Sequence, residues 1–197
     1  MPRVVDHDQR RAELASAAME LVRQQGVAAL SVRNLAAASG WSSGAVRHYL
    51  PTHRAMVELV CEHVATGFER RLRAVPPQED PVVQLRELIR AGLPLDEESR
   101  ALSQVWFAFL GAEVHEEQGA RAMVYGELAE LFVGYFTRVQ QAGFLLAGDP
   151  RAAAVATQAQ LDGLTVHLLL GGIDEAQAME ALDLLLLRLV AAPQGAV

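Results

Sequence analysis

The chain has 197 residues, of which 51% are apolar, and a formal net charge of −7. Its single cysteine, Cys61, excludes an internal disulfide framework and any metal site built from several cysteines. The N-terminus lacks the pattern of a secretory signal, and the longest apolar run, residues 182–192, is shorter than the ~20 residues of a membrane span. We therefore expect a soluble cytoplasmic protein with no membrane partner and no cofactor.

Helical periodicity runs through the whole chain, and the alternation typical of strands is absent. The first helix carries an apolar stripe of Leu14, Ala18, Leu21 and Val22, and Gly26 ends it. The sequence predicts an all-α fold of about nine helices. Their expected ranges are 8–25, a short helix between residues 31 and 40, 43–50, 52–75, 81–92, 97–115, 119–142, 150–170 and 174–191.

The second and third predicted helices are short and lie on either side of a tight turn. Ser31 and Ser42 are expected to cap them, since a serine hydroxyl accepts a hydrogen bond from a free N–H group of the first turn. Gly40 ends the second helix and Pro51 closes the third. Two such helices fit a helix-turn-helix over about residues 31–50.

Charge is distributed unevenly along the chain. No Asp or Glu occurs between Glu20 and Glu58, whereas residues 58–197 contain 20 acidic residues and 10 arginines. Such asymmetry indicates a division of roles, in which the basic part faces a polyanion. The acidic balance therefore belongs mainly to the second part of the chain.

The third helix has the features of a recognition helix for the major groove. Val46 and Leu50 share one face and are expected to anchor the helix. The outward face offers hydrogen-bond donors and no carboxylate, and Gly44 permits close approach of the backbone. The residues of that face are Ser43, Gly44, Arg47 and His48.

The fourth helix places His53 and Arg54 in its first turn, where cations oppose the helix dipole. A bound phosphate would make this placement favourable, and Ser31 could hold another phosphate in the same way. The alternative is an ordinary helical hairpin over residues 31–54 with a solvated face.

The segment "SVRNLAAASGWSSGAVRHYLPTHRAM" resembles the helix-turn-helix of TetR-type transcriptional repressors, and the match covers about residues 10–56. The resemblance implies phosphate contacts from Ser31, Tyr49 and His53. It also implies base contacts from Arg33, Ser43, Gly44, Arg47 and His48. The candidate DNA-binding residues are Ser31, Arg33, Ser42, Ser43, Gly44, Arg47, His48, Tyr49, His53 and Arg54.

Three positions depart from the family pattern. Trp41 replaces a valine in the turn, Leu50 replaces a phenylalanine, and His53 stands where lysine is common. Because histidine is only partly charged near neutral pH, the phosphate contact implied for His53 is either weaker than that of a lysine or is made by Arg54 instead.

The rest of the chain is similar to the ligand-binding and dimerisation domain of the BetI-like branch, most clearly in "DPRAAAVATQAQLDGLTVHLLL". With the linker "PPQEDP" at residues 76–81, this predicts a DNA-binding domain of residues 1–68 and an effector-binding and dimerisation domain of residues 69–197.

Two aromatic stripes of the second domain are candidates to line a partly apolar effector cavity, and ordinary core packing is the alternative for each ring. Asp162 and His167 interrupt an apolar helix. For each of them, the alternative to a ligand contact is a hydrogen bond within the protein. The candidate ligand-binding residues are Trp106, Phe109, Leu110, Tyr125, Phe132, Phe136, Gln158 and Asp162.

The last two helices are predicted to form a homodimer interface. Residues 182–191 are apolar around most of the helix circumference, so the helix needs partners on more than one side. Small residues in the preceding helix permit close approach. The candidate interface residues are Ala159, Gly163, Val166, Leu182, Leu185, Leu186 and Leu189.

Catalytic patterns are weak, because neither "EVHEE" nor "CEH" has the spacing of a metal or nucleophile site. We expect a dimeric, ligand-responsive DNA-binding regulator, a repressor rather than an enzyme, whose partners are operator DNA and a small molecule. The alternative is a helical small-molecule-binding or enzymatic protein whose N-terminal hairpin serves only assembly.

Overall fold

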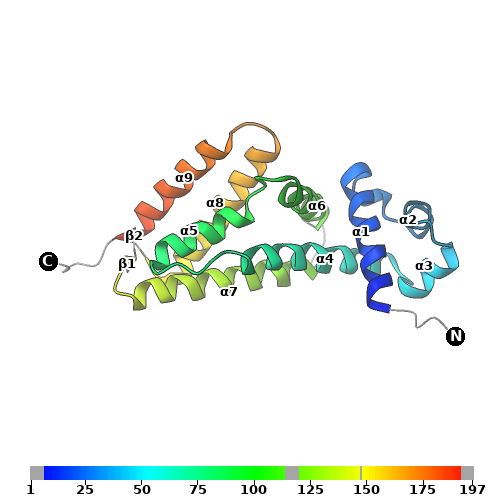
Figure 1. The fold of residues 1–197 in the computed structure, drawn as a ribbon, viewed down its shortest axis with the longest axis horizontal. Helices are drawn as coiled ribbons and strands as arrows, with labels where there is room; N and C mark the ends of the chain where they lie inside the picture. The colour runs from blue at the N-terminus through cyan, green and yellow to red at the C-terminus, as the bar shows by residue number, and fades with distance from the viewer. Residues whose placement is uncertain (1–6, 114–119, 147, 192–197) are drawn as a thin grey trace. The chain divides into compact units, whose positions relative to one another are not determined.

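The computed structural model describes residues 7–113, 120–146 and 148–191. Nine α-helices occur within these residues, and the predicted all-α fold is confirmed (Figure 1). Their bounds are α1 His7–Gln25, α2 Val32–Ser39, α3 Ser43–Tyr49, α4 His53–Arg73, α5 Pro81–Gly92, α6 Glu97–Glu113, α7 Ala120–Gln141, α8 Pro150–Leu169 and α9 Glu175–Leu189. Residues 114, 115 and 119, which the sequence placed in the sixth and seventh helices, lie outside the described residues.

The structure also contains three short elements that the sequence did not predict. A 3-10 helix, η1 (Val27–Ala29), follows α1. Strand β1 (Leu145–Leu146) pairs with the antiparallel strand β2 (Val190–Ala191), directly after α9. Strands of two residues are too short to show alternation in a sequence.

Side-chain caps account for the agreement between the predicted and the observed helix starts. Before α9, Asp174 accepts a hydrogen bond from the Gln177 backbone N–H at 2.9 Å, and the Gln177 side chain accepts one from the Asp174 N–H at 3.0 Å. This is a capping box. Thr52 accepts a hydrogen bond from the Ala55 N–H at 3.0 Å and so caps the start of α4.

The described residues pack into two units. One is drawn from Met1–Gly67 and Gln104–Arg121, and the other from Phe68–Ser103 and Ala122–Val197. The functional boundary after residue 68 stays a prediction. No helix among the described residues is long and apolar enough to cross a membrane.

The first unit contains the predicted helix-turn-helix. All four residues of the predicted α1 stripe, Leu14, Ala18, Leu21 and Val22, are buried. Helix α2 packs against both α1 and α3. The unit therefore presents α3 on a core formed by its neighbours.

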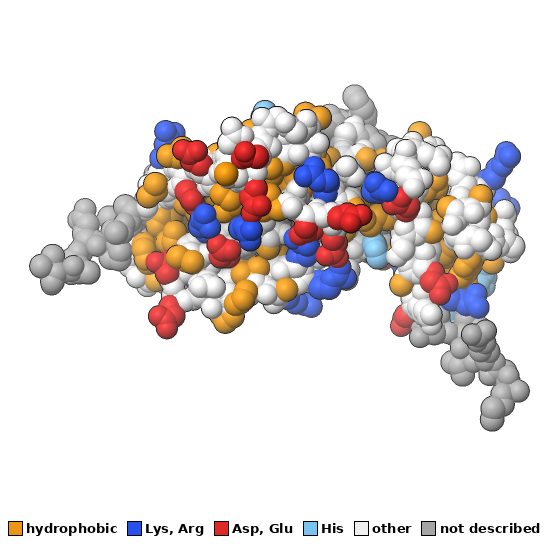
Figure 2. Space-filling view, turned by 45° about the horizontal axis from the view of Figure 1, so that its top comes forward, with side chains coloured by type: hydrophobic (Ala, Val, Ile, Leu, Met, Phe, Trp, Pro, Cys, Tyr) orange, Lys and Arg blue, Asp and Glu red, His pale blue; other side chains and the backbone are white. Residues whose placement is uncertain are grey.

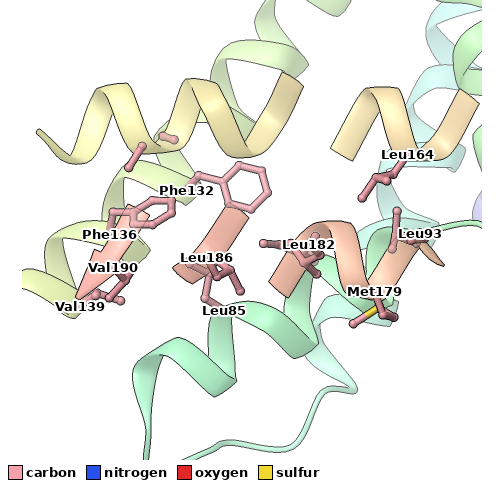
Figure 3. Packing of buried hydrophobic residues seen from close by; sticks show 14 of the residues in the cluster. Leu85, Leu93, Phe132, Phe136, Val139, Leu164, Met179, Leu182, Leu186 and Val190 are labelled. Carbon is pink, nitrogen blue, oxygen red and sulfur yellow. The ribbon is translucent and has the colours of Figure 1, made fainter. Parts of the chain in front are cut away.

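The core of the second unit is formed by helices α5, α7, α8 and α9 (Figure 3). Phe132 and Phe136 of α7 are buried there together with Leu182 and Leu186 of α9. A bidentate ion pair joins α5 to α9, because Arg86 donates to the two carboxylate oxygens of Asp183 at 2.6 and 3.1 Å. On the face of the molecule drawn in Figure 2, acidic and basic side chains alternate with hydrophobic ones.

Candidate nucleic-acid interface and effector region

Helices α2 and α3 begin at the two predicted serine caps. Ser31 Oγ accepts a hydrogen bond from the Asn34 N–H at 3.2 Å, and Ser42 Oγ accepts one from the Ala45 N–H at 3.1 Å. Gly40 ends α2 in the left-handed conformation with φ of 73°, which suits glycine because it has no Cβ. These three residues fix the turn that sets the direction of α3.

The two faces of α3 are separated as the sequence predicted. Val46 and Leu50 are buried. The outward positions are all exposed, and they are Ser43, Gly44, Arg47 and His48. Their exposure leaves three polar or basic side chains and an open glycine backbone available to a partner.

Three further basic side chains among the candidate DNA-binding residues are exposed: Arg33, His53 and Arg54. Arg54 Nε donates to Glu58 Oε1 at 2.8 Å, and this hydrogen bond and the charge of Glu58 raise the pKa of Arg54. An ion pair this exposed dissociates readily, because water and salt screen it. Arg54 can therefore leave the Glu58 carboxylate and pair with a phosphate instead.

A cluster of rings at the surface of this unit was not predicted. Tyr49, at the end of α3, is surrounded by the rings of His7, Trp41 and His48, with centroid distances of 5.4–5.7 Å. The guanidinium of Arg10 lies 5.0 Å from the centre of the Trp41 ring. His7 and Tyr49 are 42 positions apart, so no local pattern could have shown their contact.

The candidate effector residues are divided between the two units. Trp106, Phe109 and Leu110 belong to the first unit, whereas Phe132, Phe136, Gln158 and Asp162 belong to the second. Phe132 and Phe136 are buried in the core of the second unit, which is the packing role that the sequence left open as an alternative. The side chain of Tyr125 lies outside the described residues.

Gln158 differs from the other effector candidates in its hydrogen bonding. Its side chain is 7% exposed, and its Nε2 atom has no hydrogen-bond partner among the described residues. The hydroxyls of Thr157, next to it in the chain, and of Ser103 are also buried and also have no hydrogen-bond partner among the described residues. A buried donor without a partner costs about 1–3 kcal/mol, so such a group is a strong candidate to meet a ligand or a water molecule.

The predicted interface residues fall into two groups. On α8, Ala159, Gly163 and Val166 are exposed, and Val155 of α8 and Leu170, directly after α8, extend the same exposed stripe. On α9, Leu182 and Leu186 pack in the subunit core, so their side chains are not on an outer face (Figure 3).

The outward leucines of α9 are Leu184 and Leu187, which the sequence did not single out. Leu185 is half-buried, and Leu189 packs partly against the core. The run of leucines from 184 to 187 has no periodicity, and this is why the sequence could not separate the inward from the outward side chains.

Comparison with known proteins identifies both parts of the chain. Residues 14–60 match the family model of bacterial regulatory proteins of the tetR family. Residues 81–191 match the model of the C-terminal part of BetI-type transcriptional repressors. Together the two matches cover the helix-turn-helix and most of the second unit.

Individual relatives agree with these models. The transcriptional regulator BetI of Paraburkholderia xenovorans is 27% identical over 87% of this chain and 88% of its own length. The regulator PksA of Bacillus subtilis is 28% identical, but the match spans only 59% of this chain and 58% of that protein. The fold is shared with SmeT, the repressor of a multidrug efflux pump of Stenotrophomonas maltophilia, with a TM-score of 0.74 over 95% of both chains at 20% identity.

Proposed function

The chain belongs to the TetR family of bacterial regulatory proteins and is a ligand-responsive, DNA-binding transcriptional regulator, and we propose that it is a homodimeric repressor acting in the cytoplasm. It would bind a palindromic operator and leave it when a small molecule binds. The match to BetI-type repressors supports repression rather than activation.

The observation that carries this proposal is a set of exposed basic side chains that come almost entirely from a segment without acidic residues. Arg33, Arg47, His48, His53 and Arg54 are exposed on a unit whose residues 21–57 contain no Asp or Glu. The phosphate backbone of DNA attracts such a surface, and the donors of α3 can read base edges in the major groove. We assign base contacts to Arg33, Ser43, Gly44, Arg47 and His48, and phosphate contacts to Ser31, Tyr49, His53 and Arg54, with Ser42 holding the start of α3.

The test is binding to a fluorescent duplex from the DNA upstream of the protein's own gene, with an unrelated duplex of the same length as control. Arg47→Ala should reduce the preference for the operator by roughly 1–3 kcal/mol for each bidentate base contact. Arg54→Ala should weaken binding to both duplexes equally and lower the salt dependence by about 0.9 per subunit.

Arg138, an exposed cation on α7, provides the matched control, since Arg138→Ala removes the same charge away from both the proposed DNA surface and the proposed dimer interface. Wild-type affinity and salt dependence in both Arg47→Ala and Arg54→Ala would contradict the proposed DNA surface. Equal losses in Arg138→Ala would mean that net charge, and not this surface, controls binding.

For the dimer, we propose the outward stripe of α8 together with the outward leucines of α9. Helices α8 and α9 pack against each other and expose Val155, Val166, Leu170, Leu184 and Leu187. Large apolar side chains gathered on neighbouring helices are typical of an interface. Gly163 supports this choice, because a side chain at its position would meet no atom within 4 Å, which leaves room for a partner helix. A two-fold axis would then place two recognition helices on one face of DNA, ~34–36 Å apart.

For the effector, we propose a small, partly apolar molecule that accepts a hydrogen bond from Gln158. The support is the buried Nε2 donor of Gln158, which has no partner among the described residues. A ligand that binds the DNA-free state more tightly can shift the equilibrium only by its difference in affinity. Coupling of ~1–3 kcal/mol is typical, so operator affinity should fall about 5- to 150-fold at saturation, and operator DNA should weaken ligand binding by the same factor.

A further inference from the structure

The ring cluster around Tyr49 joins the first turn of α1 to the end of the recognition helix. The hydroxyl oxygen of Tyr49 lies 3.2 Å from Nδ1 of His7, within hydrogen-bond distance. The Tyr49 ring also meets Trp41 and His48 edge-on, at interplanar angles of 77° and 90°. The phenol is therefore restricted by three rings and one hydrogen bond at the surface where we place the DNA.

We propose that His7 is a positioning residue for DNA binding, which orients the Tyr49 hydroxyl toward a phosphate oxygen. This inference rests on the proposed function, because it requires the phosphate contact of Tyr49. It adds a residue of α1, outside the helix-turn-helix, to the DNA-reading surface.

The hydrogen atoms available in this contact determine how it works. A tyrosine hydroxyl has one hydrogen to donate and can accept further hydrogen bonds through its oxygen. When Tyr49 donates to a phosphate, it cannot also donate to His7, so Nδ1 of His7 must carry the hydrogen and donate to the Tyr49 oxygen. The DNA-bound state thus selects the histidine form with a hydrogen on Nδ1, and the resulting chain runs from His7 through Tyr49 to the phosphate. Hydrogen bonds in such a chain polarise and strengthen one another.

Because of where His7 lies, its substitution can affect the orientation of Tyr49 without affecting the folding of the unit. His7 is the first residue of α1 and its side chain is exposed, so its removal leaves no cavity in the core. Trp41 holds the other side of the Tyr49 ring and also carries the guanidinium of Arg10 at 5.0 Å. Without His7 the phenol keeps its contacts with the Trp41 and His48 rings but loses the third ring and the partner of its hydroxyl.

The test is a double-mutant cycle read as operator affinity. His7→Phe retains a ring against Tyr49 but cannot form a hydrogen bond, whereas His7→Asn places an amide close to the position of Nδ1. A net hydrogen bond is equivalent to about a 2- to 12-fold change in affinity for each subunit bound, and this is the loss expected for His7→Phe. His7→Asn should recover most of that loss. In a Tyr49→Phe background, His7→Phe should change affinity by less than about 1.5-fold, because its only route to DNA has been removed.

The outcomes distinguish this inference from the proposed function. An equal loss for His7→Phe with and without the Tyr49 hydroxyl would overturn the positioning role, and so would wild-type affinity in His7→Phe. In both cases the Arg47→Ala effect on operator preference would persist and the proposed function would stand. If the wild-type protein binds the operator no better than an unrelated duplex, the proposed function itself fails. Thermal unfolding of each variant checks that the fold is unchanged.

Discussion

Leu187 offers the sharpest test of assembly, because the structure separates it from the leucines of the core. Its side chain is 75% exposed in the single subunit, whereas Leu182, five positions earlier on α9, is fully buried. Complete burial of a leucine side chain contributes about 1.5–3 kcal/mol, so covering the exposed three quarters contributes about 1–2 kcal/mol per subunit. A two-fold interface contains the residue twice, which gives about 2–4 kcal/mol for the dimer.

Leu187→Ala should therefore raise the dimer dissociation constant about 30- to 700-fold, since each 1.4 kcal/mol is a factor of ten. Leu187→Glu should raise it further, because association would bury a carboxylate without a partner. The measurement is sedimentation velocity over a range of protein concentrations, combined with operator binding. Half-sites on a palindrome require both subunits, so operator affinity should fall in parallel with the loss of dimer.

Two control variants define what would refute this reasoning. Leu131→Glu introduces the same charge at an exposed leucine of α7, on neither interface helix, and should leave the dissociation constant unchanged. Leu182→Ala should lower the free energy of unfolding by about 2–5 kcal/mol, as expected for a core cavity. A Leu187→Glu protein that dimerises like wild type, or a wild-type protein that is monomeric at micromolar concentration, would exclude the proposed interface.

Three further predictions concern single residues. Ser42→Ala should destabilise α3 by ~0.5–2 kcal/mol through loss of the cap and should weaken operator binding. Ser42→Asp should keep the cap and the melting temperature but weaken binding by charge repulsion, and wild-type operator affinity in Ser42→Asp would contradict this. Gln158→Leu should preserve or raise the melting temperature, because a buried donor without a partner among the described residues is removed, and should weaken effector-driven release of DNA; unchanged release would exclude Gln158 from the effector site. Burial raises the pKa of Asp96, but hydrogen bonds from Ser99 and Arg71 outweigh this effect and leave the pKa below its ordinary value. Its stabilising effect is therefore present above the ordinary pKa and lost as the pH falls through the lowered one, so the difference in stability between wild type and Asp96→Asn should shrink as unfolding is followed from about pH 5 toward pH 2.

The sequence predicted the helices well because their ends depend on local chemistry. A serine or aspartate cap acts within three residues, as Ser31, Ser42 and Asp174 do here, and a left-handed glycine such as Gly40 acts at one position. The exposed face of α3 was predictable for the same reason, since four residues of one short helix decide it. These features need no knowledge of distant parts of the chain.

Features that depend on distant residues could not be predicted in this way. The contact of His7 with Tyr49 requires α1 and α3 to be placed in space, and nothing near residue 7 indicates it. The orientation of α9 depends on which of its leucines meets α5 and α7, and an uninterrupted leucine run is compatible with several rotations of the helix. The sequence therefore predicted an interface on α9 but placed Leu182 and Leu186 on a side that the subunit itself covers.

The buried polar groups of the second unit restrict the chemistry of an effector. Among the described residues, every polar side chain classed as buried is neutral: Ser99, Ser103, Thr157, Gln158 and Thr165. A charged ligand group that loses its water needs an opposite charge or several strong hydrogen bonds in return. A neutral ligand with one hydrogen-bond acceptor would instead satisfy the Gln158 donor and bury its apolar part against leucine and aromatic side chains. The buried polar groups of the described residues thus support the proposed uncharged, partly apolar effector.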